Sequence, residues 1–220
     1  QENFTLMRDK MDEAGEEFGR YIQVSNFCSG LCMPEMAIMG GLERLDNMAN
    51  DALYGIIYRD INMKRTLIDQ KISRFINGLF DITINTGEDN YLRTADAVSK
   101  AYTVTVSNFI NYYLAINSGL KNHQIALGHA MEINPNIENS FLLELAGAQL
   151  LRDLFPFCKT KYMPPTRYMN GNLLRTHSCD TLFNLIASLT NQDIETVGIP
   201  TEGIHTPHIA DRVIGTQNAK

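Results

Sequence analysis

The sequence predicts an α/β fold: a parallel sheet forming an incomplete (β/α)8 TIM barrel of about six strand–helix units. Two observations predict it. Short apolar runs rich in β-branched residues, such as residues 55–59 and 80–85, alternate with longer stretches of helical periodicity. The alternation repeats about every 30–40 residues, and the 220-residue chain is shorter than the roughly 250 residues of a whole barrel.

The individual elements follow from this periodicity in order along the chain. Helices are expected over residues 7–20, 34–51, 63–79, 94–120, 139–155, 173–189 and 208–218. Strands are expected over residues 21–28, 55–59, 80–85, 124–128, 161–163 and 196–199. No G-x-G-x-x-G motif and no P-loop follows any of these strands, so a nucleotide-binding, doubly wound sheet has no support.

Composition excludes several classes of protein. Hydrophobic residues make up 44% of the chain, enough for a packed core, and no apolar run is long enough to suggest a transmembrane helix. The net charge of -6 and the absence of a basic stripe argue against nucleic acid as a partner. Because Gln1 opens on one helical pattern and Lys220 closes inside another, we expect residues 1–220 to be part of a single domain truncated at both ends.

The four cysteines do not form a recognisable metal or disulfide framework. Cys28 and Cys32 give a C-x3-C spacing, but the third cysteine of a radical iron–sulfur motif is absent, and no local spacing suits a zinc site. We therefore expect buried or incidental cysteines, no metal, and a reducing cytoplasm as the location.

Polar residues follow every predicted strand, and the carboxyl ends of the strands are where TIM barrels place their active sites. These residues are Ser25, Asn26 and Ser29; Arg59, Asp60 and Asn62; Asp89 and Asn90; His129 and Glu132; Lys161 and Arg167; Glu202 and His205. Taken together, six consecutive strand ends carry groups able to bind an anion or move a proton.

Other interpretations of these residues, and of Tyr54, are also open. Asp89 and Asn90 fit helix caps equally well, His129 fits a core histidine bonded to a carbonyl, and Tyr54 fits a side chain packed beneath the sheet. Lys161, at a strand end, fits the Schiff-base lysine of an aldolase-like enzyme. A barrel without activity that only scaffolds a partner is a further alternative.

At these same strand ends the sequence resembles a known family. The segments that carry the resemblance are residues 25–30, 54–62, 85–91, 128–130, 161–166 and 202–207. They are long and unusual, and they resemble the α (large) subunits of the lysine 5,6-aminomutases over nearly the whole chain. The ornithine 4,5-aminomutases look alike here, but carry histidine at the position of Asp89 and arginine at that of Lys161, so the likeness favours the lysine branch.

The resemblance implies an isomerase of amino-acid fermentation. Its radical mechanism moves the terminal amino group of D-lysine or L-β-lysine to the adjacent carbon with pyridoxal phosphate and adenosylcobalamin. In the family, the α subunit is the barrel that holds pyridoxal phosphate. A smaller β subunit binds cobalamin and supplies the Schiff-base lysine, in an α2β2 heterotetramer. This chain lacks the D-x-H-x-x-G cobalamin motif, which agrees with that division.

The resemblance also implies residue roles. Tyr54 matches the tyrosine that stacks on the cofactor's pyridine ring, and Ser29 and Arg59 match cofactor-binding positions. Asp89 and Lys161 match catalytic positions near the substrate, where Lys161 becomes a charged neighbour paired with Asp89 rather than a Schiff base. Further cofactor-binding candidates are Asn90 and His129, and weaker site candidates are Glu132, Glu202 and His205.

Overall fold

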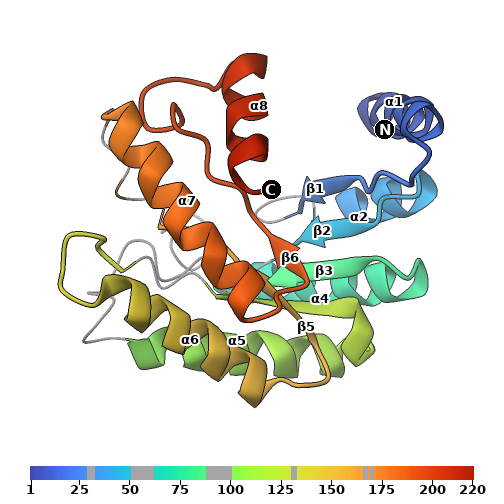
Figure 1. Ribbon diagram of the computed structural model, residues 1–220. Helices are drawn as coiled ribbons and strands as arrows, with labels where there is room; N and C mark the ends of the chain where they lie inside the picture. The colour runs from blue at the N-terminus through green and yellow to red at the C-terminus, as the bar shows by residue number, and fades with distance from the viewer. Residues whose placement is uncertain (29–32, 51–61, 88–100, 130–132, 166–167, 169–170) are drawn as a thin grey trace. The chain divides into compact units, whose positions relative to one another are not determined.

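The computed structural model describes residues 1–28, 33–50, 62–87, 101–129, 133–165, 168 and 171–220 (Figure 1). The strands are β1 (Ser25–Phe27), β2 (Asn47–Ala49), β3 (Thr83–Thr86), β4 (Ile125–His129), β5 (Lys159–Tyr162) and β6 (Ile194–Glu195). The helices are α1 (Glu2–Phe18), α2 (Met33–Leu42), α4 (Met63–Leu79), α5 (Ala101–Asn117), the 3-10 turn η2 (Asn122–Gln124), α6 (Ser140–Leu154), α7 (Leu173–Leu189) and α8 (Ile209–Asn218).

The strands form one sheet whose spatial order, β1 to β6, is their order along the chain. The described registers are all parallel, and they pair Ser25 with Asn47, Met48 with Ile84, and Lys161 with Ile194. Helices connect successive strands, as parallel pairing requires. The predicted α/β class with a parallel sheet is confirmed.

The chain divides into two compact units. Unit 1 comprises Gln1–Gly87 and Phe109–Ala126, and unit 2 comprises Glu88–Asn108 and Leu127–Lys220. Unit 1 therefore holds β1, β2 and β3, while unit 2 holds β5 and β6.

Two helices match the predicted boundaries at both ends, α4 over residues 63–79 and α7 over residues 173–189. Both begin at an asparagine whose side-chain oxygen accepts a hydrogen bond from the backbone N–H three residues later. Asn62 caps α4 through Arg65 N, and Asn172 caps α7 through Arg175 N, each at 3.1 Å.

The predicted helix over residues 34–51 is wrong in its second half, because α2 ends at Leu42 and β2 follows. Leu45 and Met48 continue the helical spacing, but the chain turns at Arg44, whose φ is 56°. Met48 then packs directly on Gly40 of α2, where any Cβ would overlap the Met48 Cε atom. The missing side chain at Gly40 thus allows the strand to close on the helix.

The other strand predictions differ in extent. The strand predicted over residues 55–59 lies outside the described residues. The sixth strand is Ile194–Glu195 rather than residues 196–199, which is a correction. Thr196 N still donates to Tyr162 O at 2.9 Å, but beyond that bond the chain leaves the sheet for a turn at Pro200.

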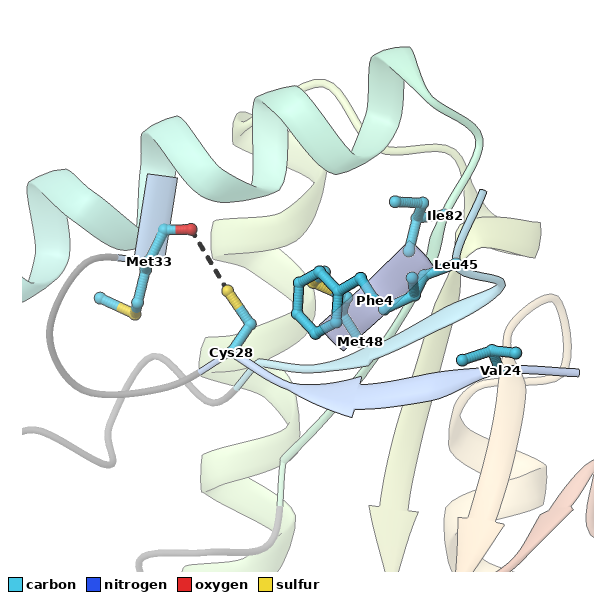
Figure 2. Close-up of a cluster of buried hydrophobic side chains, with 7 residues drawn as sticks. All are labelled: Phe4, Val24, Cys28, Met33, Leu45, Met48 and Ile82. Carbon is cyan, nitrogen blue, oxygen red and sulfur yellow. Dashed lines mark hydrogen bonds between the residues drawn. The ribbon is translucent and has the colours of Figure 1, made fainter. Parts of the chain in front are cut away.

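The core of unit 1 lies between the sheet and helices α1 and α2 (Figure 2). Its buried side chains are Phe4, Val24, Cys28, Met33, Leu45, Met48 and Ile82. The Cys28 thiol donates to the Met33 carbonyl at 3.3 Å, and burial raises the pKa of Cys28 to about 12. Cys28 and Cys158 are buried, as expected, and Cys179 is half-buried; Cys32 lies outside the described residues.

The core of unit 2 packs β5 against the neighbouring helices α6 and α7. Tyr162 is fully buried among Ala148 of α6 and Phe183 and Ile186 of α7. Successive residues of a strand point to opposite faces, so Lys161 projects from the face of the sheet that lies away from these helices. In a barrel that face is the interior.

Candidate active site

Most of the predicted site residues belong to segments that follow the strands. Ser29, Tyr54, Arg59, Asp89 and Asn90 lie outside the described residues. Their roles and the predicted pairing of Asp89 with Lys161 therefore stay predictions. The structure does place the strand ends from which these segments start.

Two of the predicted residues lie on strands in unit 2. His129 is the last residue of β4, and Lys161 is the third residue of β5. Lys161 is only 6% exposed, although an ammonium group is normally solvated. A phosphate, a phenolate or a substrate carboxylate is the kind of group that a buried ammonium at this place can bind.

The interior-facing side of β2 and β3 is polar, which the sequence reasoning missed. Asn47 and Thr83 are buried and paired in register on this face, one layer before Ala49 and Asn85. The Asn85 Oδ1 atom is buried and has no hydrogen-bond partner among the described residues. Barrel interiors are normally filled by branched apolar side chains, so small and polar residues here favour a polar ligand in the interior.

A signal for this face was present in the sequence. The alternation of small or polar residues with large apolar ones in Asn47-Met48-Ala49 and Thr83-Ile84-Asn85 is the period of a strand with one apolar face. The first of these runs was assigned to a helix, so the matching pattern of the two strands was not visible.

A buried carboxyl group on α7 was also missed. Asp180 is fully buried, and neither of its carboxyl oxygens has a hydrogen-bond partner among the described residues. Its Oδ1 atom lies so close to Gly198, which follows β6, that a Cβ there would approach within 2.5 Å. Burial, together with the charge of Glu202, raises the pKa of Asp180 to about 7. The carboxyl group therefore changes charge near neutral pH.

The weaker candidates after β6 are engaged locally. The Glu202 carboxylate accepts a hydrogen bond from Ile199 N at 3.3 Å, and His205 Nδ1 lies 2.9 Å from Thr206 O. Both side chains are exposed, and these contacts are typical of a loop that stabilises its own turn. Glu132 lies outside the described residues.

Two further observations concern metals and membranes. Within the described ranges, no three His, Cys, Asp or Glu side chains come close enough to hold a metal ion. Of the helices that the structure describes, none is both long and apolar enough to cross a membrane.

Comparison with known proteins agrees with the fold and with the strand-end pattern. Residues 1–220 match the family described as D-lysine 5,6-aminomutase TIM-barrel domain of alpha subunit. The chain is 56% identical over 220 residues to the lysine 5,6-aminomutase alpha subunit of Fusobacterium nucleatum and 54% identical to that of Acetoanaerobium sticklandii. Each alignment covers 100% of this chain and 42% of the relative, so the chain spans less than half the length of these proteins.

A more distant relative belongs to the ornithine branch. The D-ornithine 4,5-aminomutase subunit beta of Acetoanaerobium sticklandii is 29% identical over 201 residues, which cover 91% of this chain and 27% of that protein. The match over the entire chain, the parallel α/β fold and the two high identities together show that this chain belongs to the family of lysine 5,6-aminomutase α-subunit TIM-barrel domains.

Proposed function

We propose that this chain is the pyridoxal phosphate-binding barrel of an adenosylcobalamin-dependent lysine 5,6-aminomutase, an isomerase. The enzyme would move the terminal amino group of D-lysine or L-β-lysine to the adjacent carbon. The observation that carries the proposal is the identity of 54–56% along the whole chain to two lysine 5,6-aminomutase α subunits. The 29% identity to the ornithine enzyme makes ornithine 4,5-aminomutase the second choice.

The described residues fit pyridoxal phosphate. The coenzyme carries a dianionic phosphate and an ionisable phenolic oxygen, and it needs cations and hydrogen-bond donors around it. Lys161 brings a buried ammonium, which is both a cation and a hydrogen-bond donor, to the interior face. When bound, pyridoxal phosphate carries the migrating amino group, and adenosylcobalamin supplies the radical that starts the shift.

The residues of this chain then bind and orient. Tyr54 stacks on the coenzyme ring, an interaction that contributes about 0.5–1.5 kcal/mol beyond burial. Ser29 and Arg59 offer a hydroxyl and a guanidinium to the phosphate or a carboxylate, and a guanidinium binds either in a bidentate manner. Asn90 and His129 complete the polar edge of the coenzyme.

Asp89 and Lys161 are the residues that we assign to the substrate side. A carboxylate and an ammonium at this position hold the substrate's amine and carboxylate, and their charges set the ionisation of the phenolic oxygen. Lys161 is buried on the face away from α6 and α7, so water is kept from its ammonium group and its electrostatic effect is strengthened.

The proposal includes a partner. A smaller β subunit binds adenosylcobalamin and provides the Schiff-base lysine, and the two chains assemble as α2β2. We place the enzyme in the cytoplasm, where the Cys28, Cys158 and Cys179 thiols, free in the structure, remain reduced.

The experiment that tests the proposal measures coenzyme binding by the full-length protein in its complex. Tyr54→Ala should weaken pyridoxal phosphate binding by about two- to tenfold, the range that corresponds to loss of about 0.5–1.5 kcal/mol of stacking. The matched control is Tyr113→Ala, because Tyr113 is 68% exposed on α5; its affinity should equal that of the wild type. Equal affinities of the Tyr54 variant and the wild type would remove Tyr54 from the site.

Borohydride reduction with substrate separates this proposal from an aldolase or lyase. If Lys161 orients the substrate, reduction should leave Lys161 unmodified, as judged by peptide mass spectrometry. Substrate fixed covalently to Lys161 would instead support a cobalamin-independent enzyme with its own Schiff base.

A further inference from the structure

Helix α4 of unit 1 has its polar and apolar faces reversed. A surface helix normally buries an apolar stripe and exposes its charged face. In α4 the buried residues are all polar: Thr66, Asp69, Gln70, Ser73, Arg74 and Asn77. The opposite face carries six large apolar residues, each 36–69% exposed: Met63, Leu67, Ile68, Ile72, Phe75 and Leu79.

Hydrogen bonds fix α4 in this orientation. Arg74 is fully buried, and its guanidinium donates to Oδ1 of Asn50, which follows β2, at 3.1 Å. It also donates to Oγ1 of Thr86, the last residue of β3, at 3.1 Å and to Asn111 Oδ1 of α5 at 2.8 Å. Ser73 Oγ accepts from Asn50 Nδ2 at 2.9 Å. Because a rotation that buried the apolar face would break these bonds, that face stays outward while unit 1 is folded.

The neighbouring helix continues the apolar surface. Within unit 1, α5 contributes four large apolar residues that are each 39–68% exposed: Phe109, Ile110, Tyr113 and Ile116. A groove of about 190 Å³ separates the helices and is lined by Leu67, Lys71 and Leu114, among others. Phe75 Cδ2 would lie 3.9 Å from a Cβ placed at Gly119, just after α5. We call these exposed apolar residues and the groove the α4–α5 surface.

The chemistry of this surface specifies what can cover it. Large contiguous apolar patches on soluble proteins mark interaction sites, and permanent interfaces are the more hydrophobic ones. A groove between two helices accepts the apolar face of a third, amphipathic helix. The exposed charged residues of α4 are all positive, namely Lys64, Arg65 and Lys71. The complementary helix therefore carries acidic residues beside its apolar stripe.

The length of the relatives indicates the source of this helix. The chain corresponds to 42% of each of the two lysine 5,6-aminomutase α subunits, so most of each relative lies outside the aligned region. A segment of the same polypeptide is present at a high effective concentration and covers its docking site continuously. A separate subunit would leave the α4–α5 surface open until assembly, which suits a surface this apolar less well.

We propose that the α4–α5 surface is the docking site of an amphipathic helix with acidic flanks, supplied by the part of the full-length polypeptide outside residues 1–220. The inference goes beyond the proposed function and does not depend on it, because it concerns the outward face of α4 and α5 and not the carboxyl ends of the strands.

The test measures alkylation of an introduced cysteine in the full-length protein, purified without its partner subunit and kept dilute. Ile68→Cys is suitable because Ile68 is 53% exposed, so the change does not disturb the packing of unit 1. If a helix covers the site, the Ile68→Cys variant should be alkylated at least about tenfold more slowly in native buffer than in urea. Peptide mass spectrometry separates this thiol from the native cysteines.

Two controls make the result specific. The Lys10 side chain is 59% exposed on α1, away from the α4–α5 surface, and Lys10→Cys should be alkylated within about threefold of its rate in urea. Adding Lys71→Glu to the Ile68→Cys variant places a negative charge opposite the acidic flank, and should speed alkylation by about threefold. Adding Lys10→Glu instead should leave the rate unchanged.

The outcomes decide both parts of the proposal. Protection of the Ile68→Cys variant that is independent of protein concentration supports it. Alkylation as fast as in urea would show that nothing covers the α4–α5 surface. Protection that appears only at high protein concentration, only with the partner subunit or only with anionic lipid vesicles would show that the occupant is a second copy, the partner or a membrane. None of these readouts requires coenzyme binding or turnover, so failure of the proposed function would leave them unchanged.

Discussion

The two ends of the strands in unit 1 each contain a buried arginine, and the two arginines are held differently. At the amino ends, Arg8 forms ion pairs with Asp12 at 2.6 Å and with Asp46 at 3.2 Å. At the carboxyl ends, the contacts described for Arg74 are to carbonyl, amide and hydroxyl oxygens. Among the contacts that the structure describes, the arginine at one end thus meets carboxylates and the arginine at the other end meets neutral acceptors.

The amino end is built to close the fold. Arg8 Nη2 donates to Ile22 O at 2.8 Å, just before β1, and Asp46, just before β2, accepts from Val24 N at 2.7 Å. The Tyr21 hydroxyl donates to Asp46 at 2.6 Å. These bonds join α1 to the starts of two strands, whereas those of Arg74 join the ends of strands that lead into predicted site segments. The difference agrees with the general rule that barrels place stability at the amino-end face and chemistry at the carboxyl-end face.

The largest expected loss of stability concerns the amino end. Arg8→Met leaves Asp12 and Asp46 without their buried cation and should lower the free energy of unfolding by about 3 kcal/mol. That value corresponds to the loss of about two charge-assisted hydrogen bonds of the buried guanidinium, because the two carboxylates that remain are partly exposed. Urea denaturation of the full-length protein measures it. If Arg8→Met lowered the free energy of coenzyme binding as much as the free energy of unfolding, the amino ends of the strands would not serve stability alone.

A smaller effect on the free energy of unfolding, dependent on pH, is expected from Asp180 in unit 2. The pKa of Asp180 is raised from its usual 3.8 to about 7, so between about pH 4 and 7 the folded state binds more protons than the unfolded state. Stability should therefore fall as the pH rises through this window and then level off. In Asp180→Asn this contribution to the slope disappears. The shift corresponds to about 4 kcal/mol, and burying an asparagine amide without partners costs about 2 kcal/mol, so at pH 8 the variant should be more stable than the wild type by about 2 kcal/mol.

Denaturation curves of wild type and Asp180→Asn, recorded from pH 4 to 8, test this prediction. Parallel stability profiles would show that the Asp180 carboxyl group has a normal pKa. The difference between the two curves measures how much a buried carboxyl group without hydrogen-bond partners among the described residues lowers the free energy of unfolding. Arg8 and Arg74, by contrast, are buried with such partners.

The smallest effect is expected at Cys28, the residue between β1 and Ser29. Cys28→Ala removes one buried sulfur atom and its bond to Met33 O, and should cost about 1 kcal/mol. Since burial raises the pKa of Cys28 to about 12, its thiol should alkylate far more slowly at pH 8 than the half-buried Cys179. Equal alkylation rates, measured by mass spectrometry, would contradict the packing around Cys28.

The sequence predicted much of the fold because local signals and tertiary structure agree in most elements. α4 and α7 were predicted to the residue, since Asn62 and Asn172 are strong caps. β2 was missed because Leu45 and Met48 happen to follow helical spacing, whereas the packing of Met48 on Gly40 is a tertiary contact that periodicity does not contain.

The site was predicted less completely. Lys161 was identified from its place at a strand end, and its alternation with the buried Tyr162 explains its orientation. Arg74 was not identified, because α4 turns polar residues such as Gln70 and Arg74 inward and leaves apolar ones such as Phe75 exposed. A rule that places apolar residues inward predicts the opposite face.

The measurement that tests the central claim most directly is turnover by the full-length chain mixed with its cobalamin-binding partner. It is carried out anaerobically and in the dark, with D-lysine, L-β-lysine and D-ornithine offered in parallel. We expect that a lysine isomer is converted to a 5-amino product only when pyridoxal phosphate and adenosylcobalamin are both present. No turnover of either lysine isomer, together with no absorbance change on adding pyridoxal phosphate, would contradict it.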